Sequence, residues 1–510
     1  MNTPLSHQLT RRGFIAGSAG AAGMAALLSL AACAPAGGGG TVGAADLLGI
    51  LPGDEPQGWA EVKAALNEKL KADLGISYTP EFIPWSNFAQ STLLKFTSGE
   101  KFDTALEARW LHLDKLLADG ALADLTELWN SGKFPELTSS IDPQFVEFSK
   151  FKGQIYAIPQ VNSFAALAGF GIRQDLADKY GIGEVKNYQD LEKFFYDVKQ
   201  NDPGLIPFGL DAGYVNNTVN ASPVALFNEY AWENPTAIGQ LGSHAFAYMK
   251  NGTTPVPFWE APGFDDAIEK VRQYFVDGII NQDALTAEQA TTWSQFTTGV
   301  YASTVAVNDG GTTARLGSVA DNVAGAALAE VLPFADGFDA VVATNFVVGN
   351  YVVVNGGSEF AEQSMALQNW LSIKENHDLV AYGIEGRDWK PVGDSEYERL
   401  SDYAFPTFAL AWRVGLERTP VGMVESSRAW FDWAKDAAHF TADPLSGFQF
   451  DQVPVETEMA QLEAAYTQYV VPLYAGALDP KQGLSDAKKA FEDAGLDKAL
   501  TELESQIKAF

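Results

Sequence analysis

The segment that decides the fold begins with Leu47-Leu48-Gly49-Ile50-Leu51, continues through residues 59–74 and ends with Ile76-Ser77-Tyr78-Thr79-Pro80-Glu81-Phe82. The first stretch is a short apolar run, typical of a buried strand. The second repeats apolar residues at helical spacing and stops at Gly75, and the third is again strand-like. A strand, a helix and a strand in close succession predict a parallel sheet with helices on its faces.

The same alternation continues along the chain. We expect Ser86 to cap a helix that runs to about Thr97, and a further strand to begin within residues 102–106. Toward the C-terminus, amphipathic helices are expected over residues 360–374, 455–473 and 484–510, the last one interrupted at Gly495. No long linker follows residue 45. The pattern therefore predicts an α/β protein of two lobes joined by short crossovers, with extra C-terminal helices.

The N-terminal residues are typical of an export signal. Arg11-Arg12 precedes a weakly apolar run rich in Gly and Ala, and Leu30-Ala31-Ala32-Cys33 is the cleavage pattern before a lipid-modified cysteine. We expect a twin-arginine lipoprotein signal over residues 1–32, lipid on Cys33 and a flexible tether over residues 33–45. The protein would then be anchored on the extracellular face of the cell membrane. The alternative is an uncleaved membrane anchor, which the Gly and Ser within the apolar run disfavour.

Composition and charge exclude several classes of function. The 510 residues include 65 Asp and Glu against 34 Lys and Arg, which gives a formal net charge of −31. Because so acidic a chain repels phosphate backbones and anionic lipid, we expect no nucleic-acid partner and no polybasic membrane contact. The single cysteine excludes an intrachain disulfide.

The sequence lacks the motifs of catalysis and of cofactor binding. Its five histidines are scattered without the spacing of a metal pair, and it has no glycine-flanked serine elbow, phosphate loop with lysine or dinucleotide fingerprint. We therefore expect no enzyme activity, no cofactor and no metal. Acid pairs such as Asp265-Asp266 leave a glycoside hydrolase as an alternative, because two carboxylates can flank a glycosidic bond.

Aromatic residues are the positive signal for function. Aromatic rings stack on the apolar faces of sugars while nearby polar side chains bond the hydroxyls, so aromatics beside Gly, Asn, Pro or Glu indicate a carbohydrate cleft. The candidates are Trp110, Tyr214, Trp232, Trp259 and Trp293. Trp129, Trp370 and Trp430 lie on helical apolar stripes, and we assign them to the core. Between Asp211 and Arg315 only four residues are basic, Arg315 included, which favours a neutral ligand.

Several short motifs carry a family resemblance. Lys152-Gly153-Gln154-Ile155-Tyr156-Ala157-Ile158-Pro159, followed by Gly171-Ile172-Arg173-Gln174-Asp175-Leu176, resembles a signature of family 1 extracellular solute-binding proteins of ABC importers. Residues 99–103, Trp110 and residues 120–125 are similar to the N-lobe of that family. Residues 382–389, 448–451 and 494–499 resemble its large lipoprotein subgroup, which includes aldouronate and alginate-oligosaccharide binders.

The resemblance implies a type II periplasmic-binding-protein-like fold, in which two hinge-linked α/β lobes, each discontinuous in sequence, close on a ligand. It assigns residues 46–160 and 300–352 to the N-lobe, and residues 161–299 and 353–510 to the C-lobe. The implied partners are the ABC permease subunits, which such a protein meets as a monomer. The resemblance also places Trp110 on the N-lobe side of the cleft. The rest of the predicted ligand site is Asn162, Asn308, Asp309, Glu385 and Trp389.

The sequence therefore predicts a binding protein that captures a neutral oligosaccharide by lobe closure and delivers it to an ABC permease. Closure needs no bond to be made or broken, because a ligand that bridges both lobes binds the closed state better and shifts the population toward it. Two alternatives stay open. One is an exported glycoside hydrolase, and the other is the same fold with a peptide or a polyol as its ligand.

Calcium is not expected to contribute to stability. Many members of the resembled subgroup carry an acidic calcium loop, whereas Asn201-Asp202-Pro203-Gly204-Leu205-Ile206-Pro207 is short and lacks alternating oxygen ligands. We predict that millimolar Ca²⁺ leaves the melting temperature unchanged in differential scanning fluorimetry. A rise in melting temperature with calcium that Asp202→Ala abolishes would contradict this prediction.

Overall fold

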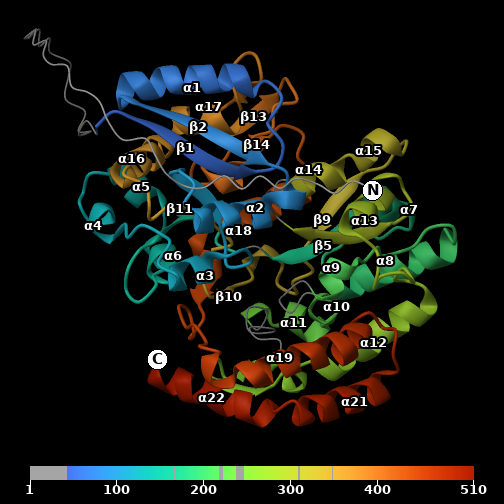
Figure 1. The fold of residues 1–510 in the computed structure, drawn as a ribbon. Helices are drawn as coiled ribbons and strands as arrows, with labels where there is room; N and C mark the ends of the chain where they lie inside the picture. The colour runs from blue at the N-terminus through green and yellow to red at the C-terminus, as the bar shows by residue number, and fades with distance from the viewer. Residues whose placement is uncertain (1–42, 166, 217–221, 237–245, 308–310, 347) are drawn as a thin grey trace, which may run out of the picture. The chain divides into compact units, whose positions relative to one another are not determined.

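The computed structural model describes residues 43–165, 167–216, 222–236, 246–307, 311–346 and 348–510. Within this part of the chain, two α/β lobes are each built around one sheet, and helices from distant parts of the sequence cover both sheets (Figure 1). The predicted signal over residues 1–32, Cys33 and most of the predicted tether lie outside the described residues. Among the helices that are described, none combines the length and hydropathy of a membrane span.

The first sheet has the strand order β2-β1-β3-β11-β4. Its strands are β1 (Ala45–Pro52), β2 (Ile76–Ile83), β3 (Thr104–Glu107), β4 (Ala157–Gln160) and β11 (Asn350–Val354). β1 pairs in parallel with β2 and β3, whereas β11 is antiparallel to both β3 and β4. The sheet is therefore mixed rather than parallel throughout, because β11 enters it from a distant part of the sequence.

The first strand-helix-strand unit confirms the sequence prediction. α1 (Trp59–Asp73) lies between β1 and β2, and its buried residues recur every three or four positions, so that one face of the helix packs against β2. The helix ends where Gly75 takes up a left-handed φ of 74°. The expected cap at Ser86 is wrong, because α2 (Trp85–Ser98) begins one residue earlier, after Pro84, whose carbonyl accepts a hydrogen bond from Asn87 N.

The second sheet includes strands from the segment 300–352. Its strand order is β8-β5-β9, with β5 (Ala168–Arg173) antiparallel to β8 (Ser303–Val307) and to β9 (Leu328–Val331). β8 and β9 come from the segment 300–352 that was assigned to the N-lobe, and of that segment only β11 returns to the first sheet. The physical reason is that every residue of β5 is buried, so its backbone needs a hydrogen-bonding partner on both edges.

The first lobe also includes helices from the segment 353–510, which the resemblance places in the C-lobe. α16 (Ala361–Leu371) and α17 (Lys374–Ala381) pack against β1, α1 and α5 (Pro135–Ser140) of the first lobe. Trp370 Nε1 donates a hydrogen bond to Asp73 Oδ2 at 2.8 Å, which joins α16 to the end of α1. Trp370 and Trp430 are buried as predicted, and Trp129 is partly buried against the core.

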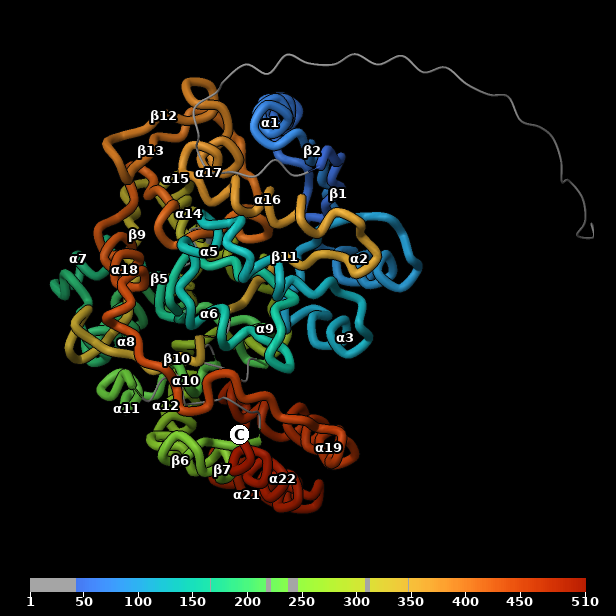
Figure 2. The backbone as a smooth tube through the Cα atoms, turned by 90° about the vertical axis from the view of Figure 1, so that its left-hand side faces the viewer, coloured from blue at the N-terminus to red at the C-terminus, as the bar shows by residue number. Residues whose placement is uncertain are grey.

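The second sheet and the C-terminal helices form the other lobe. α7 (Gln174–Lys179), α13 (Gln289–Thr297), α14 (Gly311–Gly317) and α18 (Glu425–Lys435) pack against the second sheet. α20 (Val471–Tyr474) and α21 (Pro480–Asp493) contact α12 (Phe264–Asp277). α22 (Leu496–Ala509) contacts β7 (Thr254–Pro257), as Figure 2 shows. The predicted break at Gly495 between the last two helices is confirmed, whereas the expected helix over 455–473 contains a π-helical stretch, Tyr466–Val470, after α19 (Glu456–Ala465).

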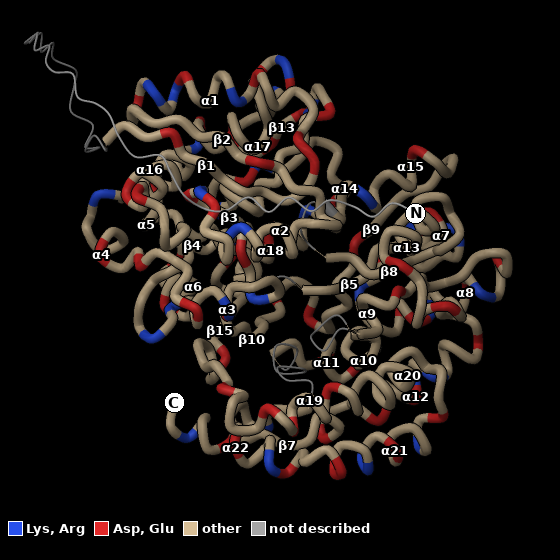
Figure 3. The backbone as a smooth tube through the Cα atoms, in the orientation of Figure 1, with Lys and Arg blue, Asp and Glu red and all other residues tan. Residues whose placement is uncertain are grey.

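Shorter elements complete the described fold. They are α3 (Leu113–Ala118), α4 (Thr126–Trp129), α6 (Pro143–Glu147), α8 (Tyr188–Asn201), α9 (Ala212–Val215), α10 (Pro223–Leu226), α11 (Glu229–Glu233), α15 (Val319–Asn322), β6 (Ala247–Lys250), β7 (Thr254–Pro257), β10 (Val342–Thr344), β12 (Trp389–Val392), β13 (Glu396–Arg399), β14 (Thr419–Pro420) and β15 (Phe440–Ala442). β12, β13 and β14 form a small sheet of their own. Figure 3 shows Asp and Glu spread over both lobes, with Lys and Arg interspersed among them.

A buried carboxyl group ends β3. The Glu107 side chain is fully buried, its Oε2 accepts a hydrogen bond from His112 N at 3.1 Å, and its Oε1 lies 3.5 Å from His112 Nδ1. Burial raises the pKa of Glu107 to about 7 and lowers the pKa of His112, so a neutral pair is favoured near neutral pH. Because the folded state holds the Glu107 proton more tightly, the stability that this proton contributes is complete below about pH 4.5 and is lost as the pH rises through 7.

We therefore predict that Glu107→Gln raises the free energy of unfolding at pH 8 by about 3 kcal/mol, because burial raises the pKa of Glu107 from its ordinary value to about 7 and a tenfold change in an equilibrium constant corresponds to about 1.4 kcal/mol. At pH 5, where Glu107 is protonated in the folded state, the difference between the variant and the parent should fall below about 1 kcal/mol. Urea unfolding at the two pH values measures this, with Glu127→Gln, an exposed carboxylate on α4, as the matched control. A variant that is less stable than the parent at pH 8 would refute the assignment.

Candidate functional site

A cavity of about 790 Å³ lies between two parts of the structure. One side is formed by α14 of the second lobe and the turn that follows it. The other side is formed by the segment 381–424, which carries the small sheet β12-β13-β14. Its walls are largely aromatic and apolar, with a few polar groups among them, which is the usual composition of a small-molecule site. The aromatic residues of the lining are Tyr382, Trp389, Tyr397, Tyr403, Phe405, Trp412 and Phe431.

A row of aromatic rings leads from the surface of the first lobe to this cavity. Trp110 is 55% exposed and Trp85 is 50% exposed, and their ring centroids are 6.1 Å apart. The Trp85 ring stacks on Phe408 at 6.0 Å, and Phe408 meets Trp412, which lines the cavity, at 5.9 Å. We call these four residues the aromatic row. Phe408 and Trp412 are partly buried, so Trp110 and Trp85 are the exposed rings of the row. Exposed aromatic rings along a surface offer stacking positions for an extended ligand.

Backbone contacts hold the outer end of the aromatic row in place. Trp110 Nε1 donates a hydrogen bond to the Gly349 carbonyl at 2.8 Å, immediately before β11. Trp85 and Trp110 follow the carboxyl ends of β2 and β3, which both run parallel to β1. In α/β folds this edge of a parallel sheet is the usual position of ligand-binding residues.

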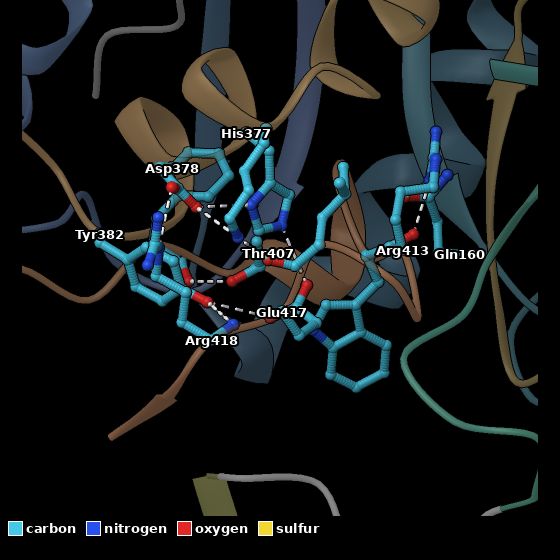
Figure 4. Close-up of polar contacts among 12 residues, drawn as sticks. Gln160, His377, Asp378, Tyr382, Thr407, Arg413, Glu417 and Arg418 are labelled. Carbon is cyan, nitrogen blue, oxygen red and sulfur yellow. Dashed lines mark hydrogen bonds and ion pairs between the residues drawn. The ribbon is translucent and has the colours of Figure 1, made fainter. Parts of the chain in front are cut away.

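A network of polar side chains stands behind the inner wall of the cavity (Figure 4). His377 is fully buried, and its Nε2 lies 3.0 Å from Glu417 Oε1. Arg418 Nε donates to Asp378 Oδ2 at 2.9 Å, while the Arg418 backbone N donates to the Tyr382 hydroxyl at 2.7 Å. Three residues of the cavity lining, Tyr382, Glu417 and Arg418, are therefore fixed in position by this network.

The charges of the network favour a protonated His377. Burial on its own lowers the pKa of His377, but the charge of Glu417 and the hydrogen bonds of Glu417 and Asp378 outweigh burial and raise the pKa above its ordinary value. Of the other charged residues in the lining, Asp388 is paired with Arg387 at 2.6 Å and Arg418 with Asp378, whereas Arg399 donates from Nε to the neutral Ser401 carbonyl at 2.7 Å. The described lining thus contains mostly charges that are already matched within the protein.

Three of the predicted site residues lie where a ligand could reach them. Asn162 and Trp389 line the cavity, and Trp110 forms the outer end of the aromatic row. Trp389 donates from Nε1 to the Gly383 carbonyl, and the Arg418 guanidinium lies 5.0 Å from the centroid of its ring. Asn308 and Asp309 lie outside the described residues, so their positions stay predictions.

The structure places the other predicted site residues away from the cavity. Trp232 is buried against Phe170 and Phe334, with its Nε1 bonded to the Leu226 carbonyl, and Tyr214 is buried in α9. Trp259 packs against Phe258 and Phe491 in the second lobe. Trp293 lies 3.7 Å below the Arg315 guanidinium, and Glu385 is exposed in the turn before β12. Polar neighbours in the sequence suggested accessible rings, but Tyr214, Trp232 and Trp293 lie within helices, where adjacent residues point in different directions, so a polar neighbour does not make the ring accessible.

Sequence reasoning missed most of the aromatic row and most of the cavity lining. Trp85, Phe408, Trp412, Tyr382, Tyr397, Glu417 and Arg418 were not predicted as site residues. For Trp85 a signal was available, because it directly follows the second strand of a predicted parallel pair. For Phe408 and Trp412 no local signal exists, since their position depends on how the segment 403–424 packs against the first lobe.

Two α/β lobes are connected here by several crossings of the chain, and Asn162 on the first crossing lines an aromatic cavity. This arrangement resembles that of the two-lobe solute-binding proteins. Known proteins of that class are similar to this chain along most of its length. Over 481 residues, 90% of this chain, the sequence is 25% identical to a protein of Streptococcus pneumoniae serotype 4 (strain ATCC BAA-334 / TIGR4) named carbohydrate ABC transporter substrate-binding protein, of which 89% is covered.

Solved structures agree with the sequence similarity. The N-glycan transport solute binding protein NgtS from Streptococcus pneumoniae matches with a TM-score of 0.73 and 19% identity, over 91% of this chain and 98% of that chain. The same protein in complex with Man5GlcNAc matches over the same shares with a TM-score of 0.63 and 19% identity. Residues 444–510 match a family model described as a domain of unknown function, DUF3502. The resemblance to extracellular solute-binding proteins is thus confirmed, and so is the two-lobe fold class.

Proposed function

We propose that this chain is the extracellular solute-binding protein of a carbohydrate ABC importer, and that it captures an oligosaccharide and delivers it to the permease. The observation that carries the proposal is the aromatic row, which ends at the aromatic cavity. The named function of the relative in Streptococcus pneumoniae and the glycan in the NgtS complex support the same ligand class.

The physical chemistry of the site favours a neutral and extended sugar. Four rings at successive distances of about 6 Å, from Trp110 to Trp412, suit a chain of pyranose units better than a single small polyol. In the described lining, Glu417 and Arg418 already have protein partners of opposite charge. Among the cations of the described lining, an acidic sugar would therefore have Arg399 to pair with but not Arg418, whereas hydroxyl groups can share the polar atoms of Asn162 and Tyr382.

Location and partners follow from this function. Lipid on Cys33 after twin-arginine export would tether the folded lobes to the outer face of the cell membrane, within reach of a permease. In this proposal the ligand bridges the lobes, favours the closed state and is released to the permease without chemical change. Location and ligand capture are tested by separate measurements. Metabolic labelling with palmitate, in the parent and in Cys33→Ser, tests the lipid anchor.

Isothermal titration calorimetry is the experiment that tests the ligand class. The panel comprises Man5GlcNAc, a linear xylo-oligosaccharide, an oligo-uronate, sorbitol and a short peptide. The proposal expects tight binding of at least one neutral oligosaccharide and weak or no binding of the peptide and the polyol. Incubation of the same oligosaccharides with the protein, followed by chromatography, separates binding from hydrolysis. Cleavage products would establish the glycoside hydrolase alternative instead.

We predict that Trp110→Ala and Trp412→Ala each weaken binding of that oligosaccharide by on the order of 1–3 kcal/mol, because each removes one stacking surface. Trp259→Ala is the matched control, since Trp259 is a partly buried tryptophan that packs in the second lobe away from the cavity. Calorimetry on variants with unchanged circular dichroism measures the effect. Equal affinity of the parent and of both row variants would remove the aromatic row from the site.

A further inference from the structure

Arg413 is the most deeply buried Arg or Lys side chain of the described residues, with an exposed fraction of 1%. Its guanidinium donates hydrogen bonds to neutral acceptors from three parts of the chain. The acceptors are Ser372 Oγ at 3.1 Å, Gln160 Oε1 at 3.2 Å, the Trp412 carbonyl at 2.6 Å and Gln368 Oε1 at 2.9 Å. Figure 4 shows Arg413 directed toward Gln160 at the end of β4.

A buried guanidinium bonded only to neutral acceptors is costly. Transfer of a charge into the interior is unfavourable unless close partners compensate it, and here burial lowers the pKa of Arg413 to about 9. The ion pairs of the described residues do not include Arg413, and Glu417 acts on it only at longer range. A methionine of similar length would fill the same space without this cost, so packing alone does not account for an arginine at this position.

The position of Arg413 is at the first connection between the two sheets. β4 ends at Gln160 in the first sheet, β5 begins at Ala168 in the second, and Val161 pairs with Arg413 in an isolated parallel bridge. Val161 N donates to the Trp412 carbonyl, the same oxygen that accepts from Arg413 Nη1. The residues next to this bridge on each segment, Asn162 and Trp412, both line the cavity.

We propose that Arg413 is a positioning residue for ligand capture: it clamps the first connection between the lobes to the segment that carries Trp412, and so sets the separation of Asn162 and Trp412 in the cavity. The inference rests on the proposed function. Gln368, which accepts from Arg413 and donates to the Leu410 carbonyl, extends the clamp to α16, so the guanidinium joins three segments of the chain at one point. Without the Arg413 guanidinium, Trp412 would no longer be held at a fixed distance from the other lining residues.

The test compares Arg413→Met and Arg413→Lys with the parent, by calorimetry against each oligosaccharide of the panel above and by thermal unfolding. Leu70→Ala is the matched control, because Leu70 is fully buried in α1, its truncation destabilises the fold, and it does not line the cavity. We expect Arg413→Met to weaken binding about tenfold at a temperature where it is folded, while Leu70→Ala lowers the melting temperature and keeps the affinity of the parent. The affinity of Arg413→Lys should lie between that of the parent and that of Arg413→Met.

The double variant Trp412→Ala with Arg413→Met distinguishes positioning from a separate structural role. If Arg413 acts through Trp412, the loss of affinity in the double variant is smaller than the product of the two single losses. The inference would be overturned if Arg413→Met bound the oligosaccharide as tightly as the parent, or if the two substitutions weakened binding independently in the double variant. Either result would leave the proposed function intact. If Arg413→Met does not fold, Arg413→Lys decides: parental affinity in that variant overturns the inference. A parent that binds no oligosaccharide of the panel would refute both proposals.

Discussion

The insertion of β11 between β3 and β4 is the constraint on which the rest of the structure depends. This strand begins at residue 350, after the chain has already built the second sheet, and it supplies hydrogen bonds to the inner edges of both neighbours. Because β11 returns to the first sheet, each lobe is discontinuous in sequence, and the chain crosses between the lobes several times at neighbouring positions. Gly349, the residue before β11, also accepts the hydrogen bond that orients Trp110. One strand pairing thus connects the architecture of the first lobe to the outer end of the aromatic row.

The site combines two kinds of surface that suit a carbohydrate. Exposed rings on the first lobe provide broad, weakly specific contact, whereas the cavity holds polar groups in fixed positions through the network of His377, Asp378, Glu417 and Arg418. The charged side chains of this network are largely paired with one another. They can therefore orient a neutral ligand without leaving an unpaired charge in the site. The acidic composition of the whole chain is therefore a property of its surface rather than of the described cavity lining.

Much of the fold was predictable because its signals are local. The periodicity of α1, the apolar runs of β1 and β2 and the break at Gly495 each depend on neighbouring residues, and each is confirmed. The lobe boundaries were not predictable in this way, because β8 and β9 are short apolar strands that either sheet could accept by their pattern alone. For the same reason Trp232, which looked accessible in the sequence, is a core residue, whereas Trp85 and Trp412 belong to the aromatic row.

The sequence by itself determined the α/β class, the run of motifs that resembles solute-binding proteins, the export signal as a prediction, and the position of Trp110 after a strand of the first lobe. Only the tertiary structure decided which aromatic rings form one surface, and that a guanidinium at position 413 meets Gln160, Gln368 and Ser372. The physical reason is distance along the chain. Hydrophobic periodicity acts over a few residues, whereas the aromatic row and the contacts of Arg413 join residues up to a few hundred positions apart, whose meeting depends on strand order.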